Sequence, residues 1–187
     1  YKLVLVLRTI FYIFAVKISS IGSHAKDEMP IEVVADIANQ ADELGMFEFD
    51  LQGGELTLRP DKLYEVVEAI KPERFYLYVT TNGYLFDAKV AEELAKLGVS
   101  RLSVSLDSFD DKVHDEFRGK KGALKKAMEA LEHAKTAGMS AYMNITVGHY
   151  NAFDEDIENL LQHSKDNGYI TLLNVACPSG SWSSNAE

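Results

Sequence analysis

Helix-forming and strand-forming segments alternate along residues 30–175, and this alternation constrains the fold more than any other feature. Each helix-period segment stops at a glycine or at a lysine–proline pair, and an apolar run rich in β-branched and aromatic residues follows within a few residues. Glycine suits a helix end because it adopts the left-handed backbone conformation that other residues resist. The pattern predicts helices over 30–44, 59–70, 87–97, 123–137 and 154–167, and strands over 47–51, 75–79, 101–106, 141–147 and 170–175.

A first strand is predicted over residues 2–7, which brings the number of strands to six. Strands joined through helices lie parallel with right-handed crossovers, so the sequence predicts an α/β fold whose sheet is either open or closed into a barrel. In both arrangements ligands bind at the carboxyl ends of the strands. No linker-like stretch divides the chain, so we interpret residues 1–187 as a single domain. The start at Tyr1 and the loop-like residues 178–187 indicate a fragment whose C-terminal domain is absent.

The charge balance and the cysteine count exclude several classes of protein. The chain has 29 acidic and 19 basic residues, a net charge of −10 and 47% hydrophobic residues. These values predict a soluble globular domain, and the net acidity argues against a nucleic-acid partner. Arg8 interrupts the apolar run over 3–16, so we expect no membrane partner and a cytoplasmic location. The single cysteine, Cys177, excludes a disulfide framework and a cysteine-rich zinc or iron site within this chain.

Polar, glycine-containing loops follow two of the predicted strands. The segment over 52–55 reads QGGE, and its two glycines allow the backbone to approach a ligand closely. Glu55 places a carboxylate beside that exposed backbone, which suits a ligand ammonium group. The segment over 80–83 reads TTNG, which is also typical of a simple turn. Two adjacent glycines are weak evidence by themselves, so a plain turn stays an alternative at both loops.

Polar side chains also occupy two strands where apolar residues are the default. Alternation along the strand that ends SVSLD puts Ser103, Ser105 and Asp107 on one face. In a barrel that face points to the interior near the mouth. Asn144 lies within the apolar strand MNITV, where a polar side chain needs a partner, water or ligand. These positions extend the candidate site across several strands.

The segment over 107–115 contains four aspartates and a histidine, followed by Arg118. It lacks the spacing of a calcium loop, and aspartate is favoured at helix starts, so helix capping is the preferred interpretation over a cation site. Arg118 offers the paired donors that bind a carboxylate, although a single arginine is more often a partner in a surface ion pair.

The order of these motifs resembles the radical S-adenosylmethionine (SAM) superfamily. GGE is followed by LRPD, VTTNG, VSLDS and VHDEFRG, and the resemblance covers nearly the whole chain. The most similar members are peptide- and cofactor-maturing enzymes of the SPASM, molybdenum-cofactor and haem-biosynthesis types. The resemblance implies a partial (β/α)6 TIM-like barrel that binds SAM beside a [4Fe-4S] cluster. It implies reductive cleavage of SAM to a 5′-deoxyadenosyl radical, which abstracts hydrogen from a peptide or cofactor precursor.

The resemblance also implies roles for individual residues. By resemblance, the ammonium group of the methionine part of SAM is bound by Gly53, Gly54 and Glu55. The carboxylate of the methionine is bound by Ser105 and Arg118, and the ribose of SAM by Asn144. Supporting positions are Asn82 and Asp107. Members usually have proline after GGE, whereas this chain has Leu56, which affects the stiffness of the loop.

The cluster motif departs from the family pattern. Members place C-x3-C-x2-C just after strand one, and the spacing puts these positions at Ile10, Phe14 and Lys17. Isoleucine and phenylalanine cannot ligate iron, and a lysine is protonated near neutral pH. We therefore expect no cluster in this sequence, no radical chemistry and weakened SAM binding. Three explanations stay open, namely a natural relative without a cluster, an altered amino-terminal sequence, and a different enzyme on the same scaffold.

Two other function classes are kept as alternatives. In the first, the chain is a non-catalytic SAM-binding or scaffold module, and the apolar segment over 10–16 covers the empty cluster site or contacts a partner. In the second, it is a metal-dependent barrel hydrolase or isomerase that uses Asp50, Glu55 and Asp107.

Overall fold

The computed structural model describes residues 4–5, 15–18, 29–148, 151–152 and 155–176. Its strands form one sheet in the order β1-β2-β3-β4-β5-β6-β7. The strands are β1 Val4–Leu5, β2 Ala15–Ile18, β3 Glu48–Leu51, β4 Tyr76–Thr81, β5 Arg101–Ser105, β6 Ser140–Val147 and β7 Ile170–Val175. The helices are α1 Ile31–Glu43, α2 Pro60–Ile70, α3 Ala88–Lys96, α4 Asp111–Arg118, α5 Ala123–Thr136 and α6 Glu155–Asn167, with short 3₁₀ turns over Leu56–Leu58 and Pro72–Arg74.

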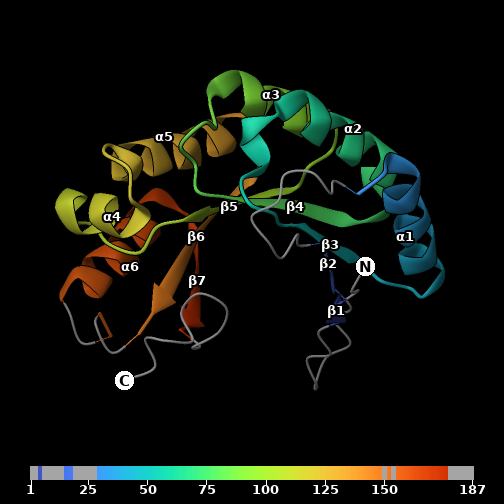
Figure 1. Ribbon diagram of the computed structural model, residues 1–187. Helices are drawn as coiled ribbons and strands as arrows, with labels where there is room; N and C mark the ends of the chain where they lie inside the picture. The colour runs from blue at the N-terminus through green and yellow to red at the C-terminus, as the bar shows by residue number, and fades with distance from the viewer. Residues whose placement is uncertain (1–3, 6–14, 19–28, 149–150, 153–154, 177–187) are drawn as a thin grey trace.

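Every neighbouring pair from β2 to β7 is parallel, which confirms the predicted α/β class. The sheet curls, and α1, α2, α3 and α5 lie along its outer side, so the arrangement is a partial barrel (Figure 1). The predicted helices and strands between residues 30 and 175 are confirmed to within a few residues at each end.

A strand lies within the predicted range 2–7, at Val4–Leu5, but the prediction that it starts the parallel sheet is wrong. This strand runs antiparallel to β2, and the first parallel strand is β2 at Ala15–Ile18. Both segments belong to one apolar run, so composition does not distinguish them. Which of the two segments becomes the first parallel strand depends on its pairing with β3, and that pairing is a tertiary contact.

The two sides of the sheet differ in chemistry. Side chains such as Phe49, Leu77 and Leu102 are fully buried and pack with the helices, so the main core lies between the sheet and its outer helices. The inner side carries polar and aromatic residues. On it the Arg101 guanidinium stacks 3.5 Å from the centroid of the Tyr78 ring, and burial raises the pKa of the Tyr78 hydroxyl above its ordinary value. The inner side is thus suited to polar ligands.

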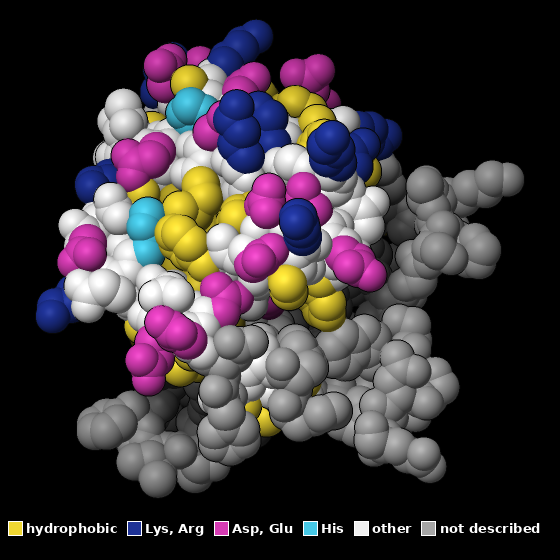
Figure 2. All heavy atoms as spheres, turned by 90° about the vertical axis from the view of Figure 1, so that its left-hand side faces the viewer, with side chains coloured by type: hydrophobic (Ala, Val, Ile, Leu, Met, Phe, Trp, Pro, Cys, Tyr) yellow, Lys and Arg dark blue, Asp and Glu magenta, His cyan; other side chains and the backbone are white. Residues whose placement is uncertain are grey.

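Helix α4 is a helix that the periodicity did not predict. Asp110 caps it by accepting hydrogen bonds from the backbone N–H groups of Lys112 and Val113, which confirms the capping interpretation of the acidic segment. The helix buries only His114 among its own residues and leaves Val113 exposed. Its two apolar residues, Val113 and Phe117, are exposed and make too short a pattern for a periodicity argument to detect. Helices α4 and α6 share the face of the molecule in Figure 2.

No helix within the described part of the chain is long and apolar enough to cross a membrane.

One helix end carries a stability prediction. Lys71, after α2, has a φ of 57° and is the one described residue other than glycine with a positive φ. A side chain in this left-handed conformation costs about 1 kcal/mol. We expect Lys71→Gly to raise the free energy of unfolding by roughly 0.5–1 kcal/mol, measured by urea denaturation. Lys71→Ala keeps a β-carbon and should bring no such gain; a loss of stability in the glycine variant would contradict this account.

Candidate functional site

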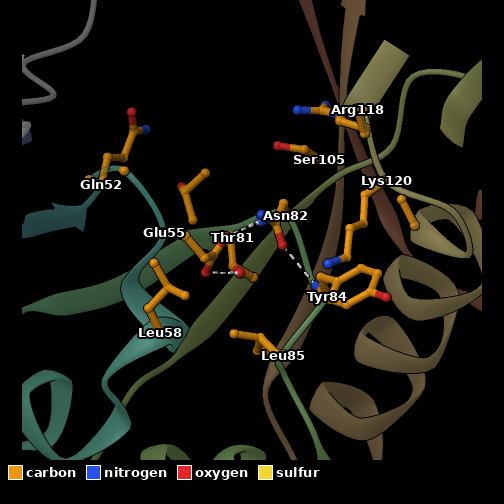
Figure 3. Close-up of a pocket in the computed structure, with 15 residues that line it drawn as sticks. Gln52, Glu55, Leu58, Thr81, Asn82, Tyr84, Leu85, Ser105, Arg118 and Lys120 are labelled. Atoms are coloured by element: carbon orange, nitrogen blue, oxygen red, sulfur yellow. Dashed lines mark hydrogen bonds between the residues drawn. The ribbon is translucent and has the colours of Figure 1, made fainter. Parts of the chain in front are cut away.

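A cavity of about 580 Å³ opens at the carboxyl ends of β3, β4 and β5 (Figure 3). Six of the eight residues that the sequence singled out line it together, namely Gly53, Gly54, Glu55, Asn82, Ser105 and Arg118. They come from two loops, the last residue of β5 and the last residue of α4, which are far apart in the sequence. The parallel topology brings them to one edge of the sheet, where the carboxyl ends of the strands meet and where ligands bind in folds of this class.

Glu55 ties two of these loops together. Its Oε1 atom accepts hydrogen bonds from the Thr57 backbone N–H at 3.0 Å and from the Thr81 hydroxyl at 2.6 Å, and Oε2 accepts one from the Asn82 backbone N–H at 2.9 Å. These bonds hold the QGGE loop against the end of β4. The carboxylate is therefore already oriented by the protein, and Oε2 keeps more acceptor capacity than Oε1.

The two glycines leave room in the cavity wall. A β-carbon at Gly54 meets nothing within 4 Å, whereas one at Gly53 lies 3.0 Å from Leu56 Cδ2. The backbone at Gly54 is thus open to an incoming group. Leu56, where related motifs have proline, packs against the loop through its side chain.

Arg118 and Ser105 face the cavity from its other side (Figure 3). One Nη of Arg118 donates to Asp107 in an ion pair, and Arg118 Nε is buried without a hydrogen-bond partner among the described residues. Asp107 has only 4% of its side chain exposed, so it holds the guanidinium in place from behind. The arginine therefore presents fixed donors at the edge of the cavity.

Asp107 and Asn144 do not line this cavity. Strand β5 ends at Ser105, so the alternation that put Asp107 on the face of Ser103 and Ser105 stops before it reaches Asp107. The Asp107 carboxylate instead pairs with Arg118 and accepts the Thr146 backbone N–H at 2.9 Å. Asn144 is paired in register with Ser105, but its side-chain oxygen accepts a hydrogen bond from Asn174.

Three further lining residues, Gln52, Thr80 and Thr81, belong to the QGGE and TTNG segments. Sequence reasoning missed the others, namely Leu58, Tyr84, Leu85, Gly119, Lys120 and Ala123. The Lys120 ammonium lies 4.9 Å from the centroid of the Tyr84 ring, so an aromatic face and a cation border the cavity together. Most of these residues lie within a few positions of a motif residue. Closeness in the sequence to a motif residue was the one signal that could have indicated them. Whether each side chain points into the cavity depends on the loop conformation.

His114 lies just behind the ion pair and carries a pH prediction. Burial, and then the charge of Arg118, lower the pKa of His114 below its ordinary value near 6.5. The unfolded chain takes up this proton first as the pH falls below about 6.5, so acidification lowers the free energy of unfolding. We expect His114→Gln to reduce that loss between about pH 7 and pH 5, measured by denaturant titration at each pH. Equal losses in the variant and the parent chain would contradict this assignment.

The residues present do not fit a [4Fe-4S] cluster. The family motif follows the first parallel strand, and in the structure that strand is β2, which ends at Ile18. Lys17, one of the three positions expected for the motif, therefore lies within the strand, in register with Asp50. The sequence that follows β2, residues 19–28, contains no cysteine, and the chain has one cysteine in all. Ile10 and Phe14 lie outside the described residues. A cluster of this type needs several thiolates. Neither the positions expected from the sequence, Ile10, Phe14 and Lys17, nor residues 19–28 after β2 supply one.

The hydrolase alternative also loses its metal site. Glu55 is bonded to Thr81 and Asn82, while Asp107 is paired with Arg118 and lines a different cavity. Within the described ranges no group of three or more His, Cys, Asp or Glu side chains is placed to hold a metal ion. Asp50 accepts hydrogen bonds from the Thr80 hydroxyl at 3.3 Å and from the Gln52 side chain, so the three carboxylates of that alternative are engaged separately.

Comparison with known proteins adds independent evidence. The sequence profile of the Radical SAM superfamily matches residues 15–163. The chain is 32% identical over 120 residues to an AdoMet-dependent heme synthase of Methanosarcina barkeri, a match that covers 64% of this chain and 34% of the relative. It is 30% identical over 135 residues to the mycofactocin maturase MftC of Mycobacterium ulcerans, covering 72% and 36%. The chain thus spans about a third of the length of these relatives.

A solved structure supports the fold. Streptococcus suis SuiB bound to the precursor peptide SuiA superposes with a TM-score of 0.73 at 19% identity, covering 86% of this chain and 36% of that one. At this identity the likeness concerns the fold alone.

Proposed function

The chain belongs to the radical SAM superfamily, and from this premise we propose that the cavity at the carboxyl ends of its strands binds S-adenosylmethionine. The observation that carries the proposal is the convergence of Gly53, Gly54, Glu55, Asn82, Ser105 and Arg118 on that one cavity of about 580 Å³. Its volume lies in the range of small-molecule sites.

The chemistry of the lining supports this ligand. Arg118 keeps guanidinium donors beyond those used for Asp107, and with the Ser105 hydroxyl it suits the methionine carboxylate. Open backbone at Gly54, next to the oriented Glu55 carboxylate, suits the ammonium group. The apolar side chain of Leu58 and the ring of Tyr84 suit the less polar parts of the nucleoside.

The proposal assigns SAM binding to this chain and no radical step to its residues. A [4Fe-4S] cluster supplies the electron that cleaves SAM, and this sequence does not hold the thiolates for one. It therefore corresponds to a SAM-binding module on the radical SAM barrel. Because the relatives include a heme synthase and a mycofactocin maturase, we place the ancestral reaction in the maturation of a cofactor or a peptide.

Titration of the purified chain with SAM by isothermal calorimetry tests the proposal. We expect Arg118→Gln to weaken binding by about 10- to 100-fold, because a charge-assisted hydrogen bond to the carboxylate is lost. We expect Gly54→Val to weaken binding as well, because the new side chain projects into open space in the cavity wall without meeting the protein.

Arg74→Gln is the matched control, because Arg74 pairs with Asp42 on the helix side of the sheet, away from the cavity. Its affinity for SAM should equal that of the parent chain. Equal weakening by both arginine variants, or binding unchanged by Arg118→Gln and Gly54→Val, would contradict the assignment of this cavity.

A further inference from the structure

A second cavity of about 560 Å³ lies between α4 and α6, on the face shown in Figure 2. It is distinct from the SAM cavity, because no described residue lines both. Its lining includes Phe109, Val113, His114, Phe117, Glu155 and Asp156.

His114 supplies this cavity with a buried donor. The residue is 1% exposed, and its Nδ1 atom accepts a hydrogen bond from the Asp107 backbone N–H at 3.4 Å. In the neutral ring the proton is then on Nε2. That atom is buried and has no hydrogen-bond partner among the described residues. A buried donor without an acceptor is costly, so an incoming acceptor at this position gains more than an ordinary hydrogen bond.

The walls of the cavity add two further requirements. Phe109, Val113 and Phe117 are large apolar side chains that are each more than a third exposed. Acidic residues border them, among them Glu155 and Asp156, and none of the described residues that line the cavity is a lysine or arginine. Figure 2 shows hydrophobic side chains with acidic ones gathered around them on this face. An occupant therefore needs apolar groups and positive charge together.

We propose that this cavity docks a peptide segment in which lysine or arginine alternates with large apolar side chains. A backbone carbonyl of the segment accepts the proton of His114 Nε2, an apolar side chain packs between Val113 and the phenylalanines, and a basic side chain meets Glu155. A peptide is the ligand class that supplies all three features at the spacing of neighbouring residues. The acidic walls repel nucleic acids, whose phosphates carry the same sign of charge. None of the described residues that this docking uses lines the cavity proposed for SAM.

Nuclear magnetic resonance titration of the ¹⁵N-labelled chain with blocked heptapeptides tests the proposal. The probe AKFLKFA carries both features, AEFLEFA reverses the charge and AKSGKSA removes the apolar side chains. We expect AKFLKFA to bind at least roughly tenfold more tightly than either of the others, as complementary charge and apolar burial act together. The largest shifts should fall on α4, the start of α6 and the His114 ring.

Two variants and two controls locate the effect. Val113→Ser and Glu155→Gln alter exposed side chains, and each should weaken AKFLKFA by roughly fivefold. Leu161→Ser removes an apolar side chain of α6 that is 39% exposed but outside the cavity, and should leave the affinity unchanged. Gly54→Val, in the SAM cavity, should also leave it unchanged.

Failure of AKFLKFA to bind at millimolar concentration, equal binding of AEFLEFA, or equal effects of Val113→Ser and Leu161→Ser would each overturn the proposal. A SAM titration on the same samples reports separately on the proposed function, so the two failures are distinguishable.

Discussion

Gly83→Ala lowers the free energy of unfolding by about 2–4 kcal/mol, because the new methyl group is both strained and crowded. Gly83 has a φ of +78°, a conformation that L side chains resist. A β-carbon there lies 3.0 Å from Ala127 Cα, a backbone atom that cannot move away cheaply, and 3.1 Å from Val104 Cγ1. The turn after β4 can therefore approach α5 only when this position lacks a side chain.

Gly45→Ala is the matched control for this prediction. Its φ is +71°, but a β-carbon there meets nothing within 4 Å. Gly45→Ala should lower the free energy of unfolding only by the strain of the left-handed backbone, about 1 kcal/mol, when both variants are measured by denaturant titration. Equal losses in the two variants would mean that crowding against α5 contributes nothing, which contradicts the packing described for the TTNG turn.

Asp107→Asn is expected to destabilise the chain by about 2 kcal/mol and to weaken SAM binding, because it leaves the Arg118 guanidinium without its counter-charge. The Asp107 carboxylate is 4% exposed, pairs with Arg118 and accepts the Thr146 backbone N–H. Asparagine can still accept from Thr146 but places its own donor or a neutral oxygen against the arginine. The arginine that faces the proposed ligand is then no longer held.

Asp110→Asn makes the same chemical change three residues away. Asp110 caps α4, and asparagine caps a helix about as well as aspartate, so the loss of stability should stay within roughly 0.5 kcal/mol. Denaturant titration and SAM calorimetry on both variants check the prediction. A loss below about 0.5 kcal/mol in Asp107→Asn would contradict the role of this buried ion pair.

The sequence was sufficient for most of the fold because two local signals agree. The apolar face of helices such as α2 recurs at helical spacing, and glycines such as Gly98 and Gly138 do adopt positive φ at helix ends. Where those signals are absent, prediction failed. Helix α4 has only two apolar residues, Val113 and Phe117, too few for a periodic signal, and the apolar run at the amino terminus contains two segments that composition alone cannot rank.

The candidate site was predictable to the extent that topology determines it. Residues placed just after parallel strands, such as Glu55 and Asn82, meet at one edge of the sheet. Asp107 lies two residues beyond the end of β5 and pairs with Arg118 rather than lining the cavity, which is compatible with the supporting role that the resemblance implies. The engagement of the Glu55 carboxylate with Thr57 and Thr81 depends on contacts between loops, which spacing along the chain does not encode.

The central claim is that this chain carries a SAM cavity but no ligands for an iron–sulfur cluster. The most direct test is the composition of the folded chain after anaerobic reconstitution with iron and sulfide in the presence of SAM. We predict bound SAM, reduced by Arg118→Gln, together with background iron and sulfide and no cluster absorption in the visible spectrum. A full cluster's complement of iron and sulfide, or the absence of bound SAM at saturating concentration, would contradict the account.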